Sequence, residues 1–279
     1  MKVREIYGVD FSGAKAAGRN IWVARTTPAG GKLRLESLDS LENICGTFER
    51  DLALAALVGM IQSTQGTLWG IDFPFGLPIE IFPAGTKWVD QLQSVSDWPG
   101  AVNAFGIDCC VRAKKLGGAM HIRRATDRQT STPFDCYHYR IIYQTFHGMR
   151  DVLAPLARDA STAILPFHYD RLERADRVVV ESCPGSTLRR LKLPHNNYKQ
   201  PTGGPLTAKR RATRKILFEA IRTRVDMTEA QLRVLQRNPG GDAFDAVVAA
   251  VGVWDAWRRV DHPSIASDHR YPLEGHVFC

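Results

Sequence analysis

Short runs of alternating or continuous apolar residues, each bounded by turn residues, predict five strands. Their β-branched and aromatic content and their length favour strands over helices. The runs cover residues 3–11, 20–27, 32–38, 68–73 and 177–182. The second and third are joined by Pro28-Ala29-Gly30-Gly31, so the first part of the chain is expected to form an antiparallel meander.

Apolar positions at helical spacing predict five longer helices, over residues 47–62, 139–159, 207–222, 228–236 and 242–259. The first is expected to start at a capping Thr47, with Leu52, Ala56 and Met60 on its buried face. Residues 195–205 lack periodicity and predict a loop.

The order of these elements indicates an α/β protein with a mixed sheet. A helix lies between the strands at 3–11 and 68–73, so these two strands are expected to be parallel neighbours. Residues 79–165 mix tryptophans, prolines and glycines with short helical pieces, and are expected to form an insertion over one edge. The chain of 279 residues is then one elaborated domain over 1–279.

Acidic residues stand where strands end and where the last helix begins. Asp10 and Asp72 close the two strands expected to be parallel neighbours, and Glu181 closes the last strand in the same sense. Asp242 and Asp245 open the final helix at i, i+3 and therefore share a face. Carboxylates gathered in this way bind hard divalent cations. Each also has a structural explanation, and Asp242 after two glycines suits a helix N-cap.

Four segments together resemble a known family. They are Gly8-Val9-Asp10-Phe11-Ser12-Gly13, Gly70-Ile71-Asp72-Phe73-Pro74-Phe75-Gly76-Leu77-Pro78, Glu181-Ser182-Cys183-Pro184 and Gly241-Asp242-Ala243-Phe244-Asp245-Ala246. The family is the predicted nucleases with an RNase H-like fold, the domain of unknown function family 429. The resemblance spans nearly the whole chain.

The resemblance implies a five-stranded RNase H-like sheet in the order 3-2-1-4-5. It implies that Asp10, Asp72, Glu181 and Asp245 or Asp242 bind the metal. Arg124-x-x-Asp127 is similar to a basic-acidic motif of the family, and Lys209 with Arg214 is similar to its Lys…Arg helix. The family often has a β-branched or aromatic residue with proline after the last strand's glutamate, whereas this chain has Ser182-Cys183-Pro184.

Composition adds a bias toward polyanionic partners. The 37 basic and 29 acidic residues give a net charge of +8. Lys209, Arg210, Arg211, Arg214 and Lys215 fall within seven residues, which suits either phosphate binding or a solvated helix face. The six cysteines include no Cys-x-x-Cys pair, which argues against structural zinc. No apolar run reaches membrane-spanning length and no signal peptide is recognisable, so a cytoplasmic protein without a membrane partner is expected.

The predicted function is a nuclease that hydrolyses phosphodiester bonds of nucleic acid with two Mg²⁺ or Mn²⁺ ions. Its expected catalytic residues are Asp10, Asp72, Glu181 and Asp245, with Asp242 as a further metal ligand. The residues expected to bind substrate are Lys209, Arg214, Arg124 and Asp127, and Trp88, Trp98 and Phe105 either stack bases or belong to the core. The alternatives are an ATP-dependent phosphotransferase of the actin or sugar-kinase type and a non-catalytic nucleic-acid-binding module.

Overall fold

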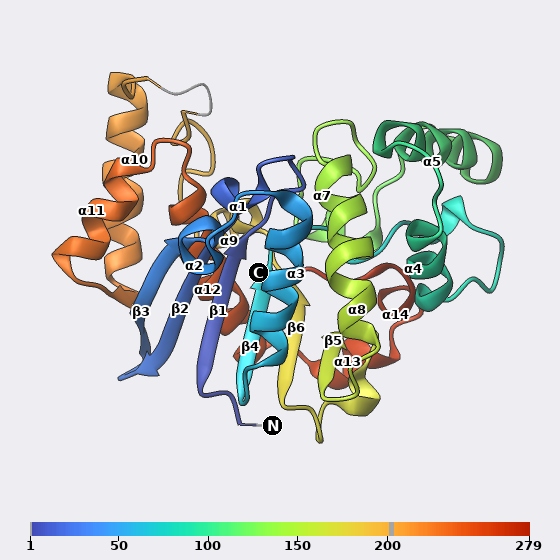
Figure 1. Cartoon of the computed structure of the whole chain (residues 1–279), viewed down its shortest axis with the longest axis horizontal. Coiled ribbons are helices and arrows are strands. Elements are labelled where there is room, and N and C mark those ends of the chain that lie inside the picture. The colour runs from blue at the N-terminus through green and yellow to red at the C-terminus, as the bar shows by residue number, and fades with distance from the viewer. Residues whose placement is uncertain (1, 201–203) are drawn as a thin grey trace.

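The computed structural model describes residues 2–200 and 204–279 of the chain. Its centre is one twisted sheet of seven strands in the order β5-β6-β4-β1-β2-β3-β7 (Figure 1). The strands are β1 Glu5–Asp10, β2 Trp22–Ala29, β3 Lys32–Ser40, β4 Thr67–Ile71, β5 Thr162–Leu165, β6 Arg177–Glu181 and β7 Val225–Asp226. The predicted α/β class with a mixed sheet is therefore confirmed.

In the middle of the sheet the strands pair as predicted, and at each edge the sheet has one strand more than predicted. β1 pairs antiparallel with β2 and parallel with β4, and β4 pairs parallel with β6. The prediction of five strands was incomplete, because β5 extends the sheet beyond β6 and β7 extends it beyond β3. Both added strands are short, and neither has the alternating pattern that would mark it in the sequence.

Helices cover both faces of the sheet. They are α1 Ala17–Asn20, α2 Leu41–Cys45, α3 Arg50–Gln62, α4 Trp88–Ser96, α5 Val102–Gly117, α6 Ala125–Gln129, α7 Ile142–His147, α8 Ala154–Ala157, α9 Pro184–Arg190, α10 Ala208–Arg222, α11 Glu229–Arg237, α12 Asp242–Arg259, α13 His262–Ser267 and α14 Tyr271–Glu274. A π-helical segment, Gly148–Leu153, joins α7 to α8 within the helical stretch predicted at 139–159. Among the described helices, none is both long enough and apolar enough to span a bilayer.

The sheet separates two hydrophobic cores. Tyr7 and Val9 pack on the α3 face, in front in Figure 1, whereas Ile6 packs on the α12 face behind. Gly8 also faces α12, and a β-carbon there would lie 2.0 Å from the carbonyl oxygen of Ala246. The glycine is therefore required by the close approach of α12 to β1.

The predicted start and buried face of the first long helix were wrong. α3 begins at Arg50 with Glu49 in the N-cap position, and Thr47 does not cap it. Its buried residues are Ala53, Leu54, Leu57, Val58 and Ile61, whereas Leu52 is 59% exposed. Apolar residues surround this helix on nearly every side, so packing against the sheet, and not periodicity, selects the buried face.

The segment 79–165 contains α4 to α8 and also β5. Its side chains share the core on the α3 face, where Trp88, Phe105 and Phe146 are all buried. Because β5 pairs with β6, this segment contributes an edge strand to the sheet in addition to covering helices.

Candidate functional site

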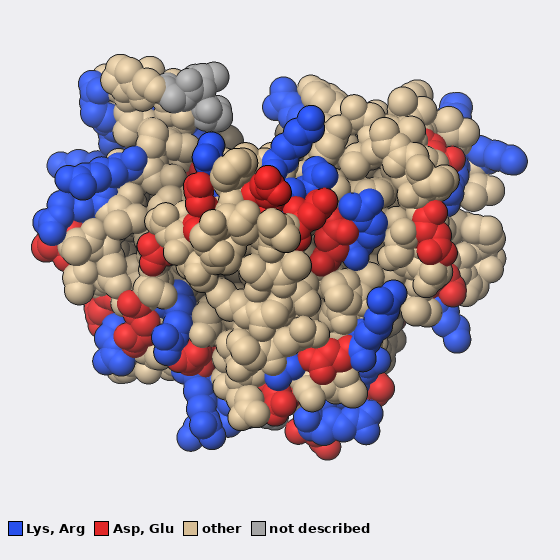
Figure 2. All heavy atoms as spheres, viewed as in Figure 1, with Lys and Arg blue, Asp and Glu red and all other residues tan. Residues whose placement is uncertain are grey.

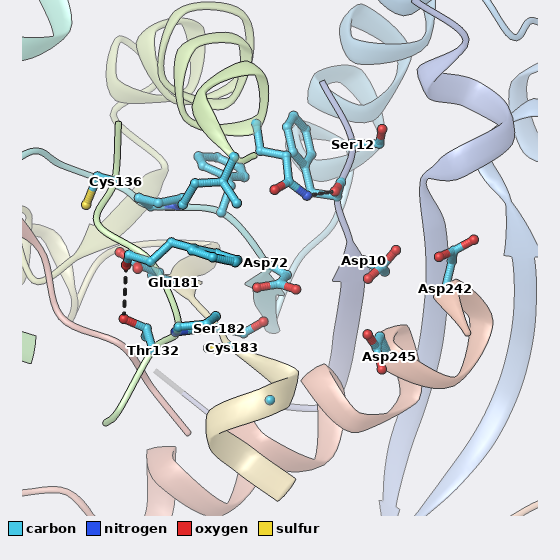
Figure 3. A pocket seen from close by; sticks show the side chains of 18 of the residues that line it. Asp10, Ser12, Asp72, Thr132, Cys136, Glu181, Ser182, Cys183, Asp242 and Asp245 are labelled. Carbon is cyan, nitrogen blue, oxygen red and sulfur yellow. Dashed lines mark hydrogen bonds between the residues drawn. The ribbon is translucent and has the colours of Figure 1, made fainter. Parts of the chain in front are cut away.

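Four aspartates meet at one end of the sheet, around a cavity of about 580 Å³ (Figure 3). Asp10 is the last residue of β1, and Asp72 directly follows β4. The backbone N–H of Asp72 donates to the carbonyl of Val9 over 3.0 Å, which holds the two strand ends side by side. Asp242 and Asp245 lie in the first turn of α12, and Figure 3 shows them beside Asp10.

Strand periodicity explains why these side chains share one side of the sheet. Side chains two residues apart along a strand point to the same face. Gly8 and Gly70 both face α12, where β-carbons would meet Ala246 and Val253 respectively. Asp10 and Asp72 each follow two residues later and so emerge on the α12 side, where that helix begins.

Burial and mutual repulsion change the acidity of the cluster. Burial raises the pKa of Asp10 well above its usual value, with Asp245, Asp242 and Asp72 adding to the rise and Lys199 opposing it. Burial, together with the charge of Asp245, raises the pKa of Asp72 to about 7. The pKa of Asp242 is raised mainly by burial. The cluster therefore carries more buried negative charge than its surroundings stabilise, and a cation would relieve it.

Lys199 supplies one such cation, and sequence analysis missed it. Its ammonium pairs with Asp245, and the hydroxyl of the preceding Tyr198 donates to the other oxygen of Asp245 over 2.8 Å. Although burial opposes it, the charges of Asp245 and Asp10 raise the pKa of Lys199 well above its ordinary value. Gly241 makes room, because a β-carbon there would lie 2.9 Å from Cγ of Lys199.

Both residues belong to the segment predicted as a loop at 195–205, of which 201–203 lie outside the described residues. No local pattern marks a lysine 46 positions before the carboxylate it pairs with. The described residues contain no group of three or more His, Cys, Asp or Glu side chains arranged to hold a metal ion.

Glu181 lies on the cavity wall but does not have the free carboxylate expected of a metal ligand. It pairs across the sheet with Ile71, whose side chain packs on the α3 face, so Glu181 leaves β6 on the face opposite Asp10. Arg124 donates to both carboxylate oxygens, over 2.7 and 2.5 Å, and the N–H of Phe75 donates to one of them over 2.9 Å.

Arg124 and Asp127 form a buried ion pair, and this pairing corrects their predicted role in binding substrate. The Arg124 side chain is 1% exposed. Its five N–H groups go to Asp127, Glu181 and the carbonyl of Glu274. No donor of Arg124 remains for a substrate. The triad of Arg124, Asp127 and Glu181 is therefore a structural support for the cavity wall.

Arg214 is likewise buried and fully engaged. It is 4% exposed and donates to the backbone carbonyls of Tyr198, Leu235 and Asn238. Arg214 therefore connects the segment that carries Lys199 to the turn before α12. Its guanidinium is used in these contacts, so the prediction that it binds phosphate is corrected. Lys209 is exposed on α10 and does not line the cavity.

Two further expectations change with the structure. Asp242 is the first residue of α12, and Gly241, with a φ of 93°, holds the N-cap position. The side-chain oxygen of Asn238 accepts hydrogen bonds from the N–H groups of Gly241 and Ala243, and Asn238 thereby provides the cap that Asp242 was expected to provide.

Trp88 is buried, stacked on Phe167 at 3.8 Å between ring centroids, and Phe105 is buried in the same core. Neither ring is open to a base.

Comparison of the chain with family models, with curated proteins and with solved structures gives no match. What the cavity can do is therefore judged from its own residues. Carboxylate oxygens from Asp10, Asp72, Asp242 and Asp245 are the donors preferred by hard divalent cations. The ammonium of Lys199 on the same cavity wall is a partner for an anion such as phosphate.

Proposed function

We infer that the protein is a divalent-cation-dependent nuclease whose active site is the aspartate cavity. The observation that carries this inference is the convergence of Asp10, Asp72, Asp242 and Asp245 from three separate elements onto one cavity. Structural roles do not account for the set, because in the described structure only Asp245 has an ion-pair partner, the single ammonium of Lys199.

Fold considerations support the same inference. The five inner strands stand in the order β3-β2-β1-β4-β6 between the added edges. With β5 and β7 left out and the others renumbered, these five have the order 3-2-1-4-5 that the resemblance to the predicted RNase H-like nucleases implies, although the complete seven-strand sheet does not match that order exactly. Carboxylates at the ends of the first and fourth strands and at the start of the last helix are what the resemblance implies for the catalytic centre. We therefore propose membership of that fold group.

The four aspartates supply the kind of oxygen ligand that Mg²⁺ or Mn²⁺ prefers, provided that the side chains move together as Lys199 is displaced, whereas Glu181 does not. All four aspartates offer carboxylate oxygens, and burial with mutual repulsion raises the pKa of Asp10 and Asp72. Both oxygens of Glu181 are held by Arg124. A bound divalent cation would lower the pKa of a water molecule and neutralise charge on a phosphodiester. Lys199 would hold a phosphate oxygen beside the aspartates.

The test is cleavage by the purified full-length protein of labelled single-stranded and duplex DNA and RNA, with Mn²⁺, Mg²⁺ or a chelator. Asp10→Asn removes a carboxylate charge at nearly constant volume, and it should reduce cleavage about a hundredfold or more. Lys32→Met changes an exposed lysine on β3, outside the cavity, and serves as the matched preparation control. Wild-type-like cleavage by Asp10→Asn would contradict the assignment.

The same preparations distinguish the alternative functions. Incubation with ATP and a panel of hydroxyl acceptors reports phosphotransfer, which an ATP-dependent kinase-like enzyme would catalyse. Nucleic-acid binding without cleavage under every cation condition would favour the non-catalytic binding module. Either result would replace the nuclease proposal.

A further inference from the structure

We propose that the residues 134–140 and the apolar groove on α5 form a track for single-stranded nucleic acid that leads into the aspartate cavity. This inference rests on the proposed function and assigns its substrate class. It is carried by a chain of ring contacts that connects two hollows of the surface, the cavity and a groove of about 920 Å³.

A ridge of rings connects the hollows. Phe134 lines the aspartate cavity and stacks on His138, with ring centroids 4.4 Å apart and planes inclined by 20°. His138 lies against Tyr139 at 4.5 Å, and Tyr139 lines the groove. Tyr139 is 73% exposed, so its ring is open to solvent and not part of the core. Phe134 and His138 are half-buried, so Tyr139 is the exposed end of this series of rings. An exposed ring is a platform on which an unpaired base stacks.

Positive charge follows the same path. The guanidinium of Arg140 lies 5.6 Å from the Phe134 ring and 5.8 Å from the Tyr139 ring. Lys114 and Lys115, on the last turn of α5, line the groove beyond Tyr139. Figure 2 shows further Lys and Arg side chains on the upper edge of the molecule at the α5–α7 end. This charge complements a phosphate backbone.

The walls of the groove favour a single strand over a duplex. Ile107 and Val111 are largely exposed in it, at 66% and 59%. A duplex offers phosphates and groove edges to a protein and keeps its base faces stacked inside. A single strand offers base faces, which are the apolar surfaces that exposed aliphatic and aromatic side chains can cover. The combination of rings, aliphatic walls and peripheral cations therefore selects unpaired nucleotides.

The test uses fluorescence anisotropy of the full-length Asp10→Asn protein with a labelled 15-nucleotide single strand and its duplex, in a chelator. Binding is then measured without cleavage, so the outcome is independent of the nuclease activity. The single strand should bind at least about tenfold tighter than the duplex. Adding Tyr139→Ala should weaken single-strand binding about fivefold to a hundredfold, in line with the loss of one stacked base.

Tyr143→Ala is the matched control, because Tyr143 is also exposed but lines neither hollow. It should leave binding unchanged. Arg140→Gln should reduce the slope of log affinity against log salt concentration by about 0.7, the value for one phosphate contact to a single strand. Equal binding of strand and duplex, or no effect of Tyr139→Ala, would overturn the track. So would binding of an acidic peptide, tested as poly-glutamate, in preference to the oligonucleotide.

Discussion

At the scale of single residues, Asp10 and Glu181 both end a buried strand, yet their side chains leave the sheet on opposite faces. Asp10 follows Gly8 on the α12 side, where Asp245 and Lys199 meet it. Glu181 is level with Ile71 on the α3 side, where Arg124 binds it. The position of a carboxylate at a strand end therefore does not decide its chemistry. The face on which it emerges determines whether it meets other carboxylates or an arginine.

Glu181→Gln should distinguish a structural role of Glu181, in its ion pair with Arg124, from a role in metal binding. The substitution removes one charge from a buried ion triad, so the free energy of unfolding should fall by about 3 kcal/mol. Binding of Mn²⁺, followed by calorimetric titration, should persist, because the oxygens of Glu181 are already held by Arg124. Asp72→Asn is the comparison and should weaken Mn²⁺ binding. If the folded Glu181→Gln protein no longer bound Mn²⁺, Glu181 would be a metal ligand after all.

Lys199→Met should expose the competition between a lysine and a metal ion for the same carboxylates. Without its ammonium the aspartates lose their cation, so the melting temperature in a chelator should fall by several degrees at pH 7.5. The further rise in melting temperature that Mn²⁺ produces should be larger than in the wild type, because no resident cation has to be displaced. Lys209→Met, an exposed lysine on α10, should change neither value. An unaltered Mn²⁺ response in Lys199→Met would contradict this competition.

At the scale of elements, the close packing of α12 on the sheet positions half of the aspartate cluster. α12 is buried along most of its length, and it approaches β1 at Gly8, β4 at Gly70 and α9 at Gly252. These small residues allow the helix axis to lie near the strands, so its first turn reaches the end of β1. The distance between Asp10 and Asp245 is therefore set by the backbone packing of α12 on the sheet, including the contact between Gly8 and Ala246 that lies next to both carboxylates.

Gly8→Ala should disturb this packing. Its β-carbon would meet the backbone of Ala246 and Ala250, which cannot rotate away, so α12 must shift. Overpacking of this kind costs about 1–3 kcal/mol of stability, measurable by urea unfolding, and should also reduce Mn²⁺ binding. Gly59→Ala on α3 is the matched control, since nothing lies within 4 Å of its β-carbon. That change should stabilise the protein by about 0.5–1 kcal/mol, as alanine favours a helix over glycine.

At the scale of the whole molecule, a sheet with a hydrophobic core on each face carries a charged cavity where its central strands β1 and β4 end. The protein carries a net charge of +8, yet the cavity concentrates aspartates. Folding brings these carboxylates together and removes water from them, which raises the pKa of Asp10, Asp72 and Asp242. A fold that creates such a cluster gives up some stability at neutral pH unless a cation is bound.

This cost predicts a pH dependence of stability. The folded-state pKa of Asp72 is raised to about 7, so between about pH 4 and 7 the folded protein binds more protons at this residue than the unfolded chain does. Stability from this group therefore falls as pH rises through that window. His168 and His276 oppose it below about pH 6.5, because burial lowers their pKa to about 4.

Comparing the wild type with Asp72→Asn cancels the contribution of the histidines. In a chelator, the melting temperature of Asp72→Asn relative to the wild type should increase as pH rises from 5 to 8. Mn²⁺ should remove much of the difference at pH 8 by stabilising the ionised wild type. A difference that stays constant across the pH series would show that Asp72 titrates near its ordinary value when folded.

The elements of the fold could largely be read from the sequence, because the signals that define them are local. The helix predicted at 242–259 has those bounds in the structure, and α10 starts after Thr207, whose side chain caps it. The apolar runs that predicted β1, β4 and β6 are buried over nearly their whole length. Since strand ends of parallel neighbours share an edge, the meeting of Asp10 with Asp72 could be predicted as well.

Tertiary structure alone decided which side chains have partners at the site. Glu181 and Arg214 carry the residue types expected of a metal ligand and a phosphate ligand, but long-range contacts with Arg124 and with backbone carbonyls occupy them. Lys199 joins the aspartates from an irregular segment that has no pattern to read. The edge strands β5 and β7 are four and two residues long, too short for periodicity to appear. In each case the deciding contact joins residues distant in sequence, and its energy exists only once the sheet and α12 have packed.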